Sequence, residues 1–346
     1  MRRNYLIALF LTLALGGAVA ETNLNGAGAT FPNPIYSKWF DEYHKLHPDI
    51  KINYQSIGSG GGIRQLQSGT VDFGASDGPM TDDQIQQTPF KLFHIPTVLG
   101  AVVPTYNIPG VSGELKFTGP VIADIYLGKI KRWNDPQLTK LNPGVKLPDT
   151  DIVVVHRSDP SGTSYIFTDY LSKVSQDWAN GPKKGTGINW PVGLGGKGNE
   201  GVSGTVKQTE GAIGYVELIY ALSNNMPYGS VQNTAGIFVK GSLASVTAAA
   251  AAVKDMPDDF RVSITNAPGK DVYPISSFTW LLVPVEWSDA GKEKAFVDFL
   301  NWMVTHGQDM TSTLQYAPLP SVVASKVKAR IKQIKVKGQQ AKKQFN

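Results

Sequence analysis

The chain of 346 residues, 41% of them hydrophobic, is long enough to bury a large core and to form about two domains. It contains no cysteine, which excludes disulfides and thiol chemistry. The net charge of +5 is unevenly distributed: two arginines lie near the start, and eight lysines and arginines follow Ala324 with no acid among them. Without these ten charges the rest of the chain carries −5, so an acidic body precedes a basic end.

Residues 1–20 have the three parts of a secretory signal peptide: two arginines, an apolar run from Tyr5 to Leu15, and a small-residue end at Ala18-Val19-Ala20. The apolar run is too short for a stable membrane anchor. No cysteine follows the predicted cleavage after Ala20, which excludes a lipid anchor on cysteine. We therefore expect the mature chain to begin at Glu21 and to lie in a bacterial periplasm, or otherwise outside the cytoplasm.

Helix-like and strand-like patterns alternate along the rest of the chain, with frequent glycine and proline between them, and this predicts the α/β class. Small residues come directly before a helix pattern at 26–32 and again at 58–62, where the alternating strand 51–57 ends. A short strand at 71–76 then ends at Asp77. Small residues let the backbone approach a ligand closely. The alternatives are ordinary strand–turn–helix connections and a turn role for Asp77.

The stretch 153–164 combines a charged side chain, hydroxyl groups and a predicted helix start. A β-branched run ends at Arg157, and the loop that follows places Ser161, Gly162 and Thr163 where a helix begins. A helix N-terminus offers free backbone N–H groups and a partial positive charge, so these residues and the guanidinium describe an oxyanion site. The alternative is a simple helix cap with a surface pair between Arg157 and Asp159.

A further glycine-rich stretch, 193–198, matches the pattern G-x-G-x-x-G of dinucleotide-binding proteins. We expect no strand before it, because Trp190-Pro191 interrupts the chain there. Without a strand before it and a helix after it the pattern is weak evidence, and we interpret this stretch as a loop.

Taken together, these segments make the chain resemble the family of periplasmic phosphate-binding proteins of the ABC-type phosphate uptake system. The resemblance runs through nearly the whole predicted mature chain. It rests on GAGATFP at 26–32, IGSGGG at 57–62, VDFGASD at 71–77, DIYLGKI at 124–130, SDPSGTS at 158–164, WPVGLGGKGN at 190–199 and GAIGYVE at 211–217.

The resemblance implies a two-lobed periplasmic-binding-protein (Venus-flytrap) fold, in which each lobe is a mixed sheet flanked by helices and two hinge strands join the lobes. Lobe I would comprise 21–96 plus 275–324, and lobe II would comprise 97–274. Residues 325–346 would form a basic C-terminal tail, either a solvated, partly helical or disordered end or, as an alternative, a segment that faces an anionic partner such as a lipid surface.

The resemblance also implies that phosphate binds between the lobes and is passed to an inner-membrane phosphate permease. The implied phosphate-binding residues are Thr30, Phe31, Ser59, Asp77, Arg157, Ser161, Gly162 and Thr163, with Asp159 orienting Arg157. Phe31 and Gly162 would act through their backbone N–H groups. The chain departs from the pattern at Gly60, Pro160 and His156, where the family often has Ser, Gly and Arg. Asp77 fits beside an anion only if the ligand brings a proton, as protonated phosphate does and sulfate does not.

The implied protein has no catalytic residues, metal or cofactor, and we expect a monomer that binds no nucleic acid. A phosphatase with Ser59 or Ser161 as nucleophile is the alternative function, but it needs a base or metals. His44 and His47 lie near each other without a visible third ligand, which favours an exposed polar face over a metal site. The acidic body argues against a role for the basic end in nucleic-acid binding.

Overall fold

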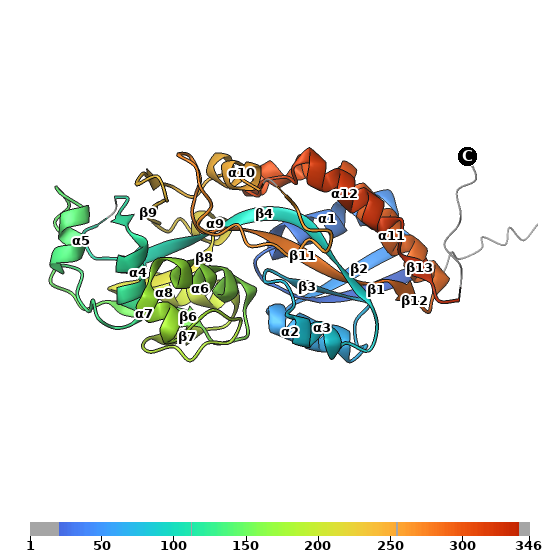
Figure 1. Ribbon diagram of the computed structural model, residues 1–346, viewed down its shortest axis with the longest axis horizontal. Coiled ribbons are helices and arrows are strands. Elements are labelled where there is room, and N and C mark those ends of the chain that lie inside the picture. The colour runs from blue at the N-terminus through green and yellow to red at the C-terminus, as the bar shows by residue number, and fades with distance from the viewer. Residues whose placement is uncertain (1–20, 112, 254, 339–346) are drawn as a thin grey trace, which may run out of the picture.

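A computed structural model describes residues 21–111, 113–253 and 255–338, so the predicted signal peptide and residues 339–346 lie outside the described part. Eight strands form one mixed sheet in the order β2-β1-β3-β11-β4-β8-β6-β7. Figure 1 shows two masses, one at each end of the molecule, with β4 and β11 running between them. This arrangement confirms the predicted α/β, two-lobed fold class.

The first lobe contains one end of the sheet. Its helices cover both faces, because Leu24 of β1 packs into the large core with α1 and α11, whereas Ala27 packs with Ile63 and Leu66 of α2 on the other face. The elements are β1 (Thr22–Gly28), α1 (Asn33–Leu46), β2 (Ile50–Ser56), α2 (Ser59–Gln67), β3 (Phe73–Ser76), α3 (Asp82–Gln86), β11 (Ser276–Pro284), β12 (Glu286–Trp287), α11 (Ala290–Thr305), the 3₁₀ helix η1 (Gly307–Leu314), α12 (Ser321–Ile331) and β13 (Lys335–Val336).

The second lobe contains the other end of the sheet and a small sheet in the order β10-β9-β5. Helix α8 packs on β6 and β8, and α10 packs on β4 and β11 where the lobes join. The elements are β5 (Lys116–Phe117), α4 (Gly119–Tyr126), α5 (Pro136–Leu141), β6 (Val153–Arg157), α6 (Gly162–Val174), α7 (Gln176–Asn180), β7 (Leu194–Gly196), α8 (Gly198–Gln208), β8 (Ala212–Glu217), α9 (Leu218–Ser223), β9 (Ser230–Gln232), β10 (Phe238–Val239) and α10 (Leu243–Ala251).

Strand β4 (Leu92–Asn107) is shared by both lobes. Its first part, up to Ala101, pairs with β11 antiparallel, and its second part, from Val102, pairs with β8 antiparallel. Nearly all of its side chains are buried, as expected for a strand covered on both faces. The change of pairing partner lies between Ala101 and Val102; the lobe boundaries inferred from the sequence stay a prediction.

The basic C-terminal segment packs on the first lobe as far as the structure describes it. Val327, Ile331 and Ile334 are buried, and β13 pairs with β12 in parallel. Lys335 forms an ion pair with Glu286 at 3.0 Å. The apolar side of α12 therefore contributes to the core, while Lys326 and Arg330 donate to the carbonyl oxygens of Met256 and Asp258 at 2.8 and 2.6 Å.

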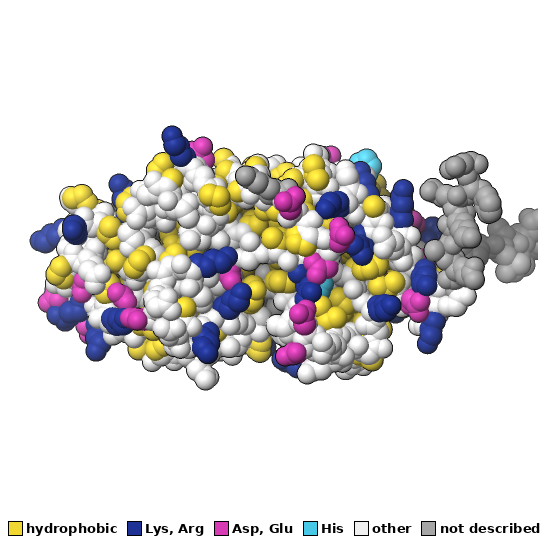
Figure 2. Space-filling view, viewed as in Figure 1, with side chains coloured by type: hydrophobic (Ala, Val, Ile, Leu, Met, Phe, Trp, Pro, Cys, Tyr) yellow, Lys and Arg dark blue, Asp and Glu magenta, His cyan; other side chains and the backbone are white. Residues whose placement is uncertain are grey.

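The two lobes touch where α2 of the first lobe meets the loop before α6 of the second. Figure 2 shows a notch between the two lobes on the lower side of this view. Gly60 of α2 donates its backbone N–H to the carbonyl oxygen of Pro160 at 3.0 Å. A Cβ atom at Gly60 would lie 2.5 Å from Pro160 Cβ, closer than real Cβ contacts allow. The missing side chain at 60 and the proline ring at 160, two departures from the family pattern, thus lie against each other across the lobes.

Candidate functional site

The residues implied as a site lie where strands end and helices begin. In the first lobe Thr30 and Phe31 follow β1, Ser59 is the first residue of α2, and Asp77 follows β3. Strand β3 is short and buried, and β11 and β1 hold it on both sides, so the carboxylate is placed at the end of a central strand. All four side chains are buried.

The second lobe contributes the end of β6 and the first turn of α6. Ser161 caps this helix, because its Oγ accepts a hydrogen bond from Ser164 N at 3.0 Å. Gly162 is the first helical residue, and the first N–H groups of a helix have no partner within it. The expected strand, loop and helix start therefore form as predicted, and the start of α6 faces the first lobe.

The two sets of residues meet. Ser59 Oγ accepts a hydrogen bond from Asp77 N at 3.2 Å within the first lobe. A Cβ atom on Gly162 of the second lobe would lie 2.4 Å from Ser59 Oγ and 2.6 Å from Asp77 Oδ2. Only glycine fits this approach. The structure thus brings the implied residues together from both lobes, and their role in binding an anion stays a prediction.

Arg157 is 3% exposed and is held by a carboxylate. Its Nε and Nη2 donate to Asp159 Oδ1 and Oδ2 at 2.8 and 2.5 Å, so the pair is bidentate. Asp159 also accepts from Gly198 N at 3.0 Å. Burial raises the pKa of Asp159, but the hydrogen bonds and charge of Arg157 outweigh it and hold that pKa below its ordinary value. The pair is a buried anchor, not the surface pair of the alternative interpretation.

The four site hydroxyls share one feature: each oxygen already accepts a protein N–H. Ser59 Oγ and Ser161 Oγ accept from backbone groups, as described above. Thr163 Oγ1 accepts from Arg157 Nη1 at 3.3 Å, and Thr30 Oγ1 accepts from Asn199 Nδ2 at 2.7 Å. A hydroxyl has one proton of its own to donate. All four groups therefore keep that proton for another acceptor, which suits an anion.

Asp77 is the only carboxylate among the implied anion-binding residues. It is 1% exposed, and its Oδ1 accepts from Thr279 Oγ1 at 2.8 Å. Its Oδ2 has no hydrogen-bond partner within the described residues. Burial raises the pKa of Asp77 to about 7, against smaller opposing effects of the Thr279 hydrogen bond and the Arg157 charge. A buried carboxyl group with a free oxygen is suited to share a proton with a ligand.

Sequence reasoning missed two residues of this site. Thr279 of β11 orients Asp77, although more than two hundred positions separate them. Asn199 in the first turn of α8 donates to both Thr30 and Thr163. Its signal was present, because Asn199 is the last residue of the string at 190–199 that carried part of the resemblance. Thr279 offers no comparable signal.

The interpretation of 193–198 as a loop was wrong. Leu194–Gly196 forms β7, which pairs with β6 in parallel, and α8 begins at Gly198. Three small or exposed residues make a weak strand pattern, and the pairing with β6 supplies what local propensity does not. The segment contacts residues of the candidate site. Gly198 N donates to Asp159, and Asn199 donates to Thr30 of the first lobe and Thr163 of the second.

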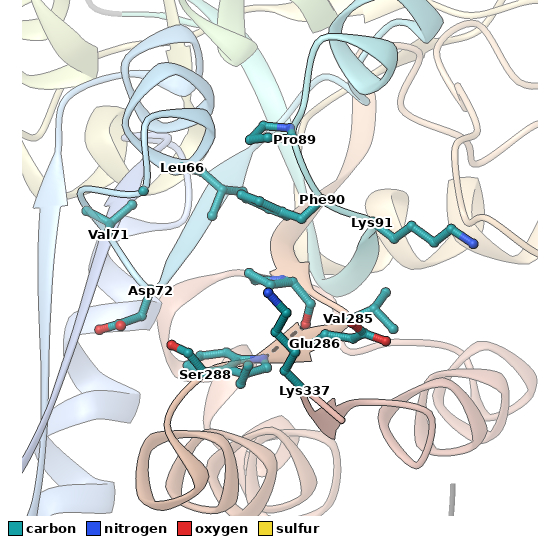
Figure 3. Close-up of a pocket in the computed structure, with 13 residues that line it drawn as sticks. Leu66, Val71, Asp72, Pro89, Phe90, Lys91, Val285, Glu286, Ser288 and Lys337 are labelled. Atoms are coloured by element: carbon teal, nitrogen blue, oxygen red, sulfur yellow. Dashed lines mark hydrogen bonds between the residues drawn. The ribbon is translucent and has the colours of Figure 1, made fainter. Parts of the chain in front are cut away.

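A cavity of about 690 Å³ lies elsewhere, between the end of α2 and the β12–β13 pair (Figure 3). Its polar side chains are exposed or already paired: Lys91 and Lys337 are exposed, and Asp72 binds Lys292 at 3.0 Å. None of the implied site residues lines it. The cavity therefore offers no buried, unpaired polar side chain among the described residues, so the interlobe cluster is the better candidate site.

Comparison with known proteins gives the same family as the sequence strings. Residues 16–306 match a family model described as a PBP superfamily domain. The chain is 46% identical over 311 residues to the phosphate-binding protein PstS of Xylella fastidiosa (strain Temecula1 / ATCC 700964), covering 89% of this chain and 85% of that one. It is 43% identical over 333 residues to PstS of Haemophilus influenzae, covering 96% and 98%.

Solved structures share the fold at lower identity. A high-affinity periplasmic phosphate-binding protein (PfluDING) bound with phosphate at pH 8.5 matches with a TM-score of 0.72 and 21% identity, covering 89% of this chain and 93% of that one. A putative phosphate ABC transporter substrate-binding protein from Clostridium perfringens matches with a TM-score of 0.62 and 18% identity, covering 86% and 100%. The matches along the chain confirm the resemblance: the protein belongs to the PBP superfamily and, within it, to the family of phosphate-binding proteins PstS.

Proposed function

We propose that this protein captures inorganic phosphate between its lobes, outside the cytoplasm, and delivers it to an ABC-type phosphate permease. The observation that carries the proposal is the convergence of four proton-bearing hydroxyls, one guanidinium and one carboxylate with a free oxygen between the lobes. The relatives that cover most of this chain are named phosphate-binding protein PstS, which supports the same ligand.

The donor set suits a tetrahedral anion stripped of water. Each oxygen of such an anion needs fixed donors to replace its hydration. Short serine and threonine hydroxyls supply them with little loss of side-chain freedom, and the first turns of α2 and α6 add backbone N–H groups. Arg157 supplies a full positive charge whose position Asp159 holds. We assign Thr30, Phe31, Ser59, Asp77, Arg157, Ser161, Gly162 and Thr163 to the phosphate site, with Asp159 behind Arg157.

Asp77 gives the site its selectivity in this proposal. When phosphate binds, one proton lies between Asp77 Oδ2 and a phosphate oxygen. Sulfate at neutral pH brings no proton, so an ionised Asp77 would face it with two negative charges in contact. A buried repulsion of this kind excludes the wrong anion without adding much affinity for the right one.

We propose a binding protein without catalysis. Ser59 and Ser161 each accept a backbone N–H, and within the described residues no histidine hydrogen-bonds to either hydroxyl. His44 instead places Nδ1 2.7 Å from the carbonyl oxygen of Ile50. Across the residues that the structure describes, no group of three His, Cys, Asp or Glu could hold a metal ion. A phosphatase would need one of these devices to activate a serine.

The location follows from the predicted signal peptide, which lies outside the described residues. In the described ranges no helix has both the length and the apolar character to cross a membrane. We propose that export releases the chain after Ala20 into the periplasm, where it would meet the permease.

The direct test is calorimetry of the purified mature protein with phosphate, arsenate and sulfate. We expect Arg157→Ala to lose most of the phosphate affinity, since removing one partner of a buried charge pair costs roughly 2–5 kcal/mol. Arg157→Lys should recover only part, because lysine lacks the planar fork. Arg132→Ala removes an exposed arginine of the same lobe and serves as control. Near-normal affinity in Arg157→Ala would place the site elsewhere.

A second prediction concerns pH and sulfate. Because burial raises the pKa of Asp77 to about 7, lowering the pH through that value protonates the carboxyl group, which can then donate to sulfate. We expect sulfate affinity of the wild type to rise as pH falls from 8 to 6. At pH 8 the preference for phosphate should be roughly 10⁴–10⁵-fold.

The matched variant for this prediction is Asp77→Asn, whose amide offers either a donor or an acceptor at any pH. It should bind sulfate at pH 8 and show no such pH dependence, while phosphate binding persists. Titrations at fixed ionic strength measure both anions. If the variant excludes sulfate as the wild type does, another feature of the cleft sets the selectivity.

A third prediction concerns closure at Gly60 and Pro160. Serine at 60 would place its Cβ against the proline ring in the closed arrangement, so Gly60→Ser should weaken phosphate binding roughly tenfold or more. It should also increase the radius of gyration of the phosphate-loaded protein in X-ray scattering. Adding Pro160→Gly should restore both the phosphate affinity and the radius of gyration, because it removes the proline ring.

Gly204→Ser is the matched control for this pair, since a Cβ there meets no atom within 4 Å. If Gly60→Ser has the same effect with and without the Pro160→Gly substitution, the two positions do not act together.

A further inference from the structure

Asn199 is fully buried at the start of α8 and contacts residues of both lobes. Its side-chain Nδ2 donates to Thr30 Oγ1 at 2.7 Å and to Thr163 Oγ1 at 3.1 Å. Its backbone N–H also donates to Thr30 Oγ1, at 3.2 Å. Thr30 follows β1 and Thr163 lies in the first turn of α6, so one amide group joins a candidate site residue of the first lobe to one of the second.

The orientation of this amide follows from its third partner. Glu217 N donates to Asn199 Oδ1 at 2.9 Å, and a backbone N–H needs an acceptor. The oxygen of the amide must therefore face Glu217, and the NH₂ group must face the two hydroxyls. Glu217 ends β8, which pairs with the shared strand β4, so the amide is anchored to the centre of the sheet.

This orientation controls the protons of the two threonines. Because each Oγ1 accepts from Asn199, neither hydroxyl can direct its own proton at that amide. Thr163 Oγ1 also accepts from Arg157 Nη1, and Thr30 Oγ1 also accepts the backbone N–H of Asn199. The lone pairs of both oxygens are thereby occupied, and the remaining hydroxyl direction is a donor direction.

We propose that Asn199 is a positioning residue of the anion site, which directs the hydroxyl protons of Thr30 and Thr163 at the anion and fastens the closed lobes. The proposal rests on the proposed function. Tyr220 of α9 supports the same contact by donating to the carbonyl oxygen of Thr30 at 2.6 Å. Thr30 is thus held by the second lobe through both its side chain and its backbone.

Two consequences separate this role from a purely structural one. The contact between Asn199 and Thr30 exists only when the lobes are together, so its loss should act on phosphate release more than on capture. An aspartate at 199 keeps the shape and the bond to Glu217 N, but it replaces the NH₂ donor with an acceptor. The threonine protons would then turn to the aspartate and away from the anion.

The experiment compares wild type, Asn199→Ala and Asn199→Asp by phosphate calorimetry, stopped-flow dissociation and thermal unfolding without ligand. Asn142→Asp is the matched control, because Asn142 is buried in the second lobe and bonds backbone groups of Lys116 and Leu138 away from the site. We expect Asn199→Ala to raise the phosphate Kd about tenfold to a hundredfold, as the loss of one or two net hydrogen bonds implies. Most of the change should lie in the dissociation rate.

Asn199→Asp should bind more weakly than Asn199→Ala, although it is the closer mimic of asparagine in shape. Wild-type affinity in Asn199→Asp would overturn the role of Asn199. So would an Asn142→Asp variant that loses as much phosphate affinity as Asn199→Asp does. A wild type that binds no phosphate in the same calorimetry would instead overturn the proposed function.

A double-mutant cycle keeps the proposal testable if Asn199→Asp does not fold. Asn199→Ala should cost less affinity in a Thr30→Val, Thr163→Val background than in the wild type, because its partners are already absent. Equal costs in both backgrounds would show that Asn199 does not act through the threonine hydroxyls.

Discussion

An anion that leaves water must receive hydrogen bonds from donors already in place, and in the proposed phosphate site the interlobe cluster would supply them from both lobes. The donors are short because long side chains would have to be ordered first. The hydroxyl oxygens of Ser59, Ser161, Thr30 and Thr163 each accept a hydrogen bond from a protein N–H group. Each hydroxyl can therefore donate its own proton to another acceptor. The fold supplies this by ending strands β1, β3 and β6 at the same place.

The charges of the site follow from the same constraint. One guanidinium would be costly if buried alone, and Asp159 offsets that cost through two hydrogen bonds while taking a third from Gly198 N. Asp77 is treated differently: only Oδ1 is bonded, to Thr279, and burial raises its pKa. The pKa of Asp159 is therefore lowered and that of Asp77 is raised, because a guanidinium pairs with Asp159 and not with Asp77.

Much of the site could be predicted from local sequence, because strand, small-residue loop and helix start are all encoded within about a dozen positions. Ser59, Gly162 and Ser161 lie where such patterns place them. Thr279 could not be found in this way, since β11 reaches Asp77 only through the order of strands in the sheet.

Two further limits of local reasoning appear in the second half of the chain. Strand β7 has too little β propensity to be recognised alone, and its pairing with β6 decides its conformation. The charges of residues 326–337 favour an exposed tail, yet the apolar positions between them, Val327, Ile331 and Ile334, place that segment on the first lobe. Spacing of the apolar residues is the stronger signal there, because charged side chains on one face leave the other free to pack.

The contact between Gly60 and Pro160 also constrains the order in which the two positions could change. Starting from serine at 60 and glycine at 160, removing the serine side chain first leaves only a small gap between the lobes. Introducing proline first would force its ring against the serine Cβ and hold the lobes apart. Between that pair of residues and the present one, the steric contact therefore favours the path through glycine at both positions, and serine at 60 conflicts with the proline for as long as the proline remains.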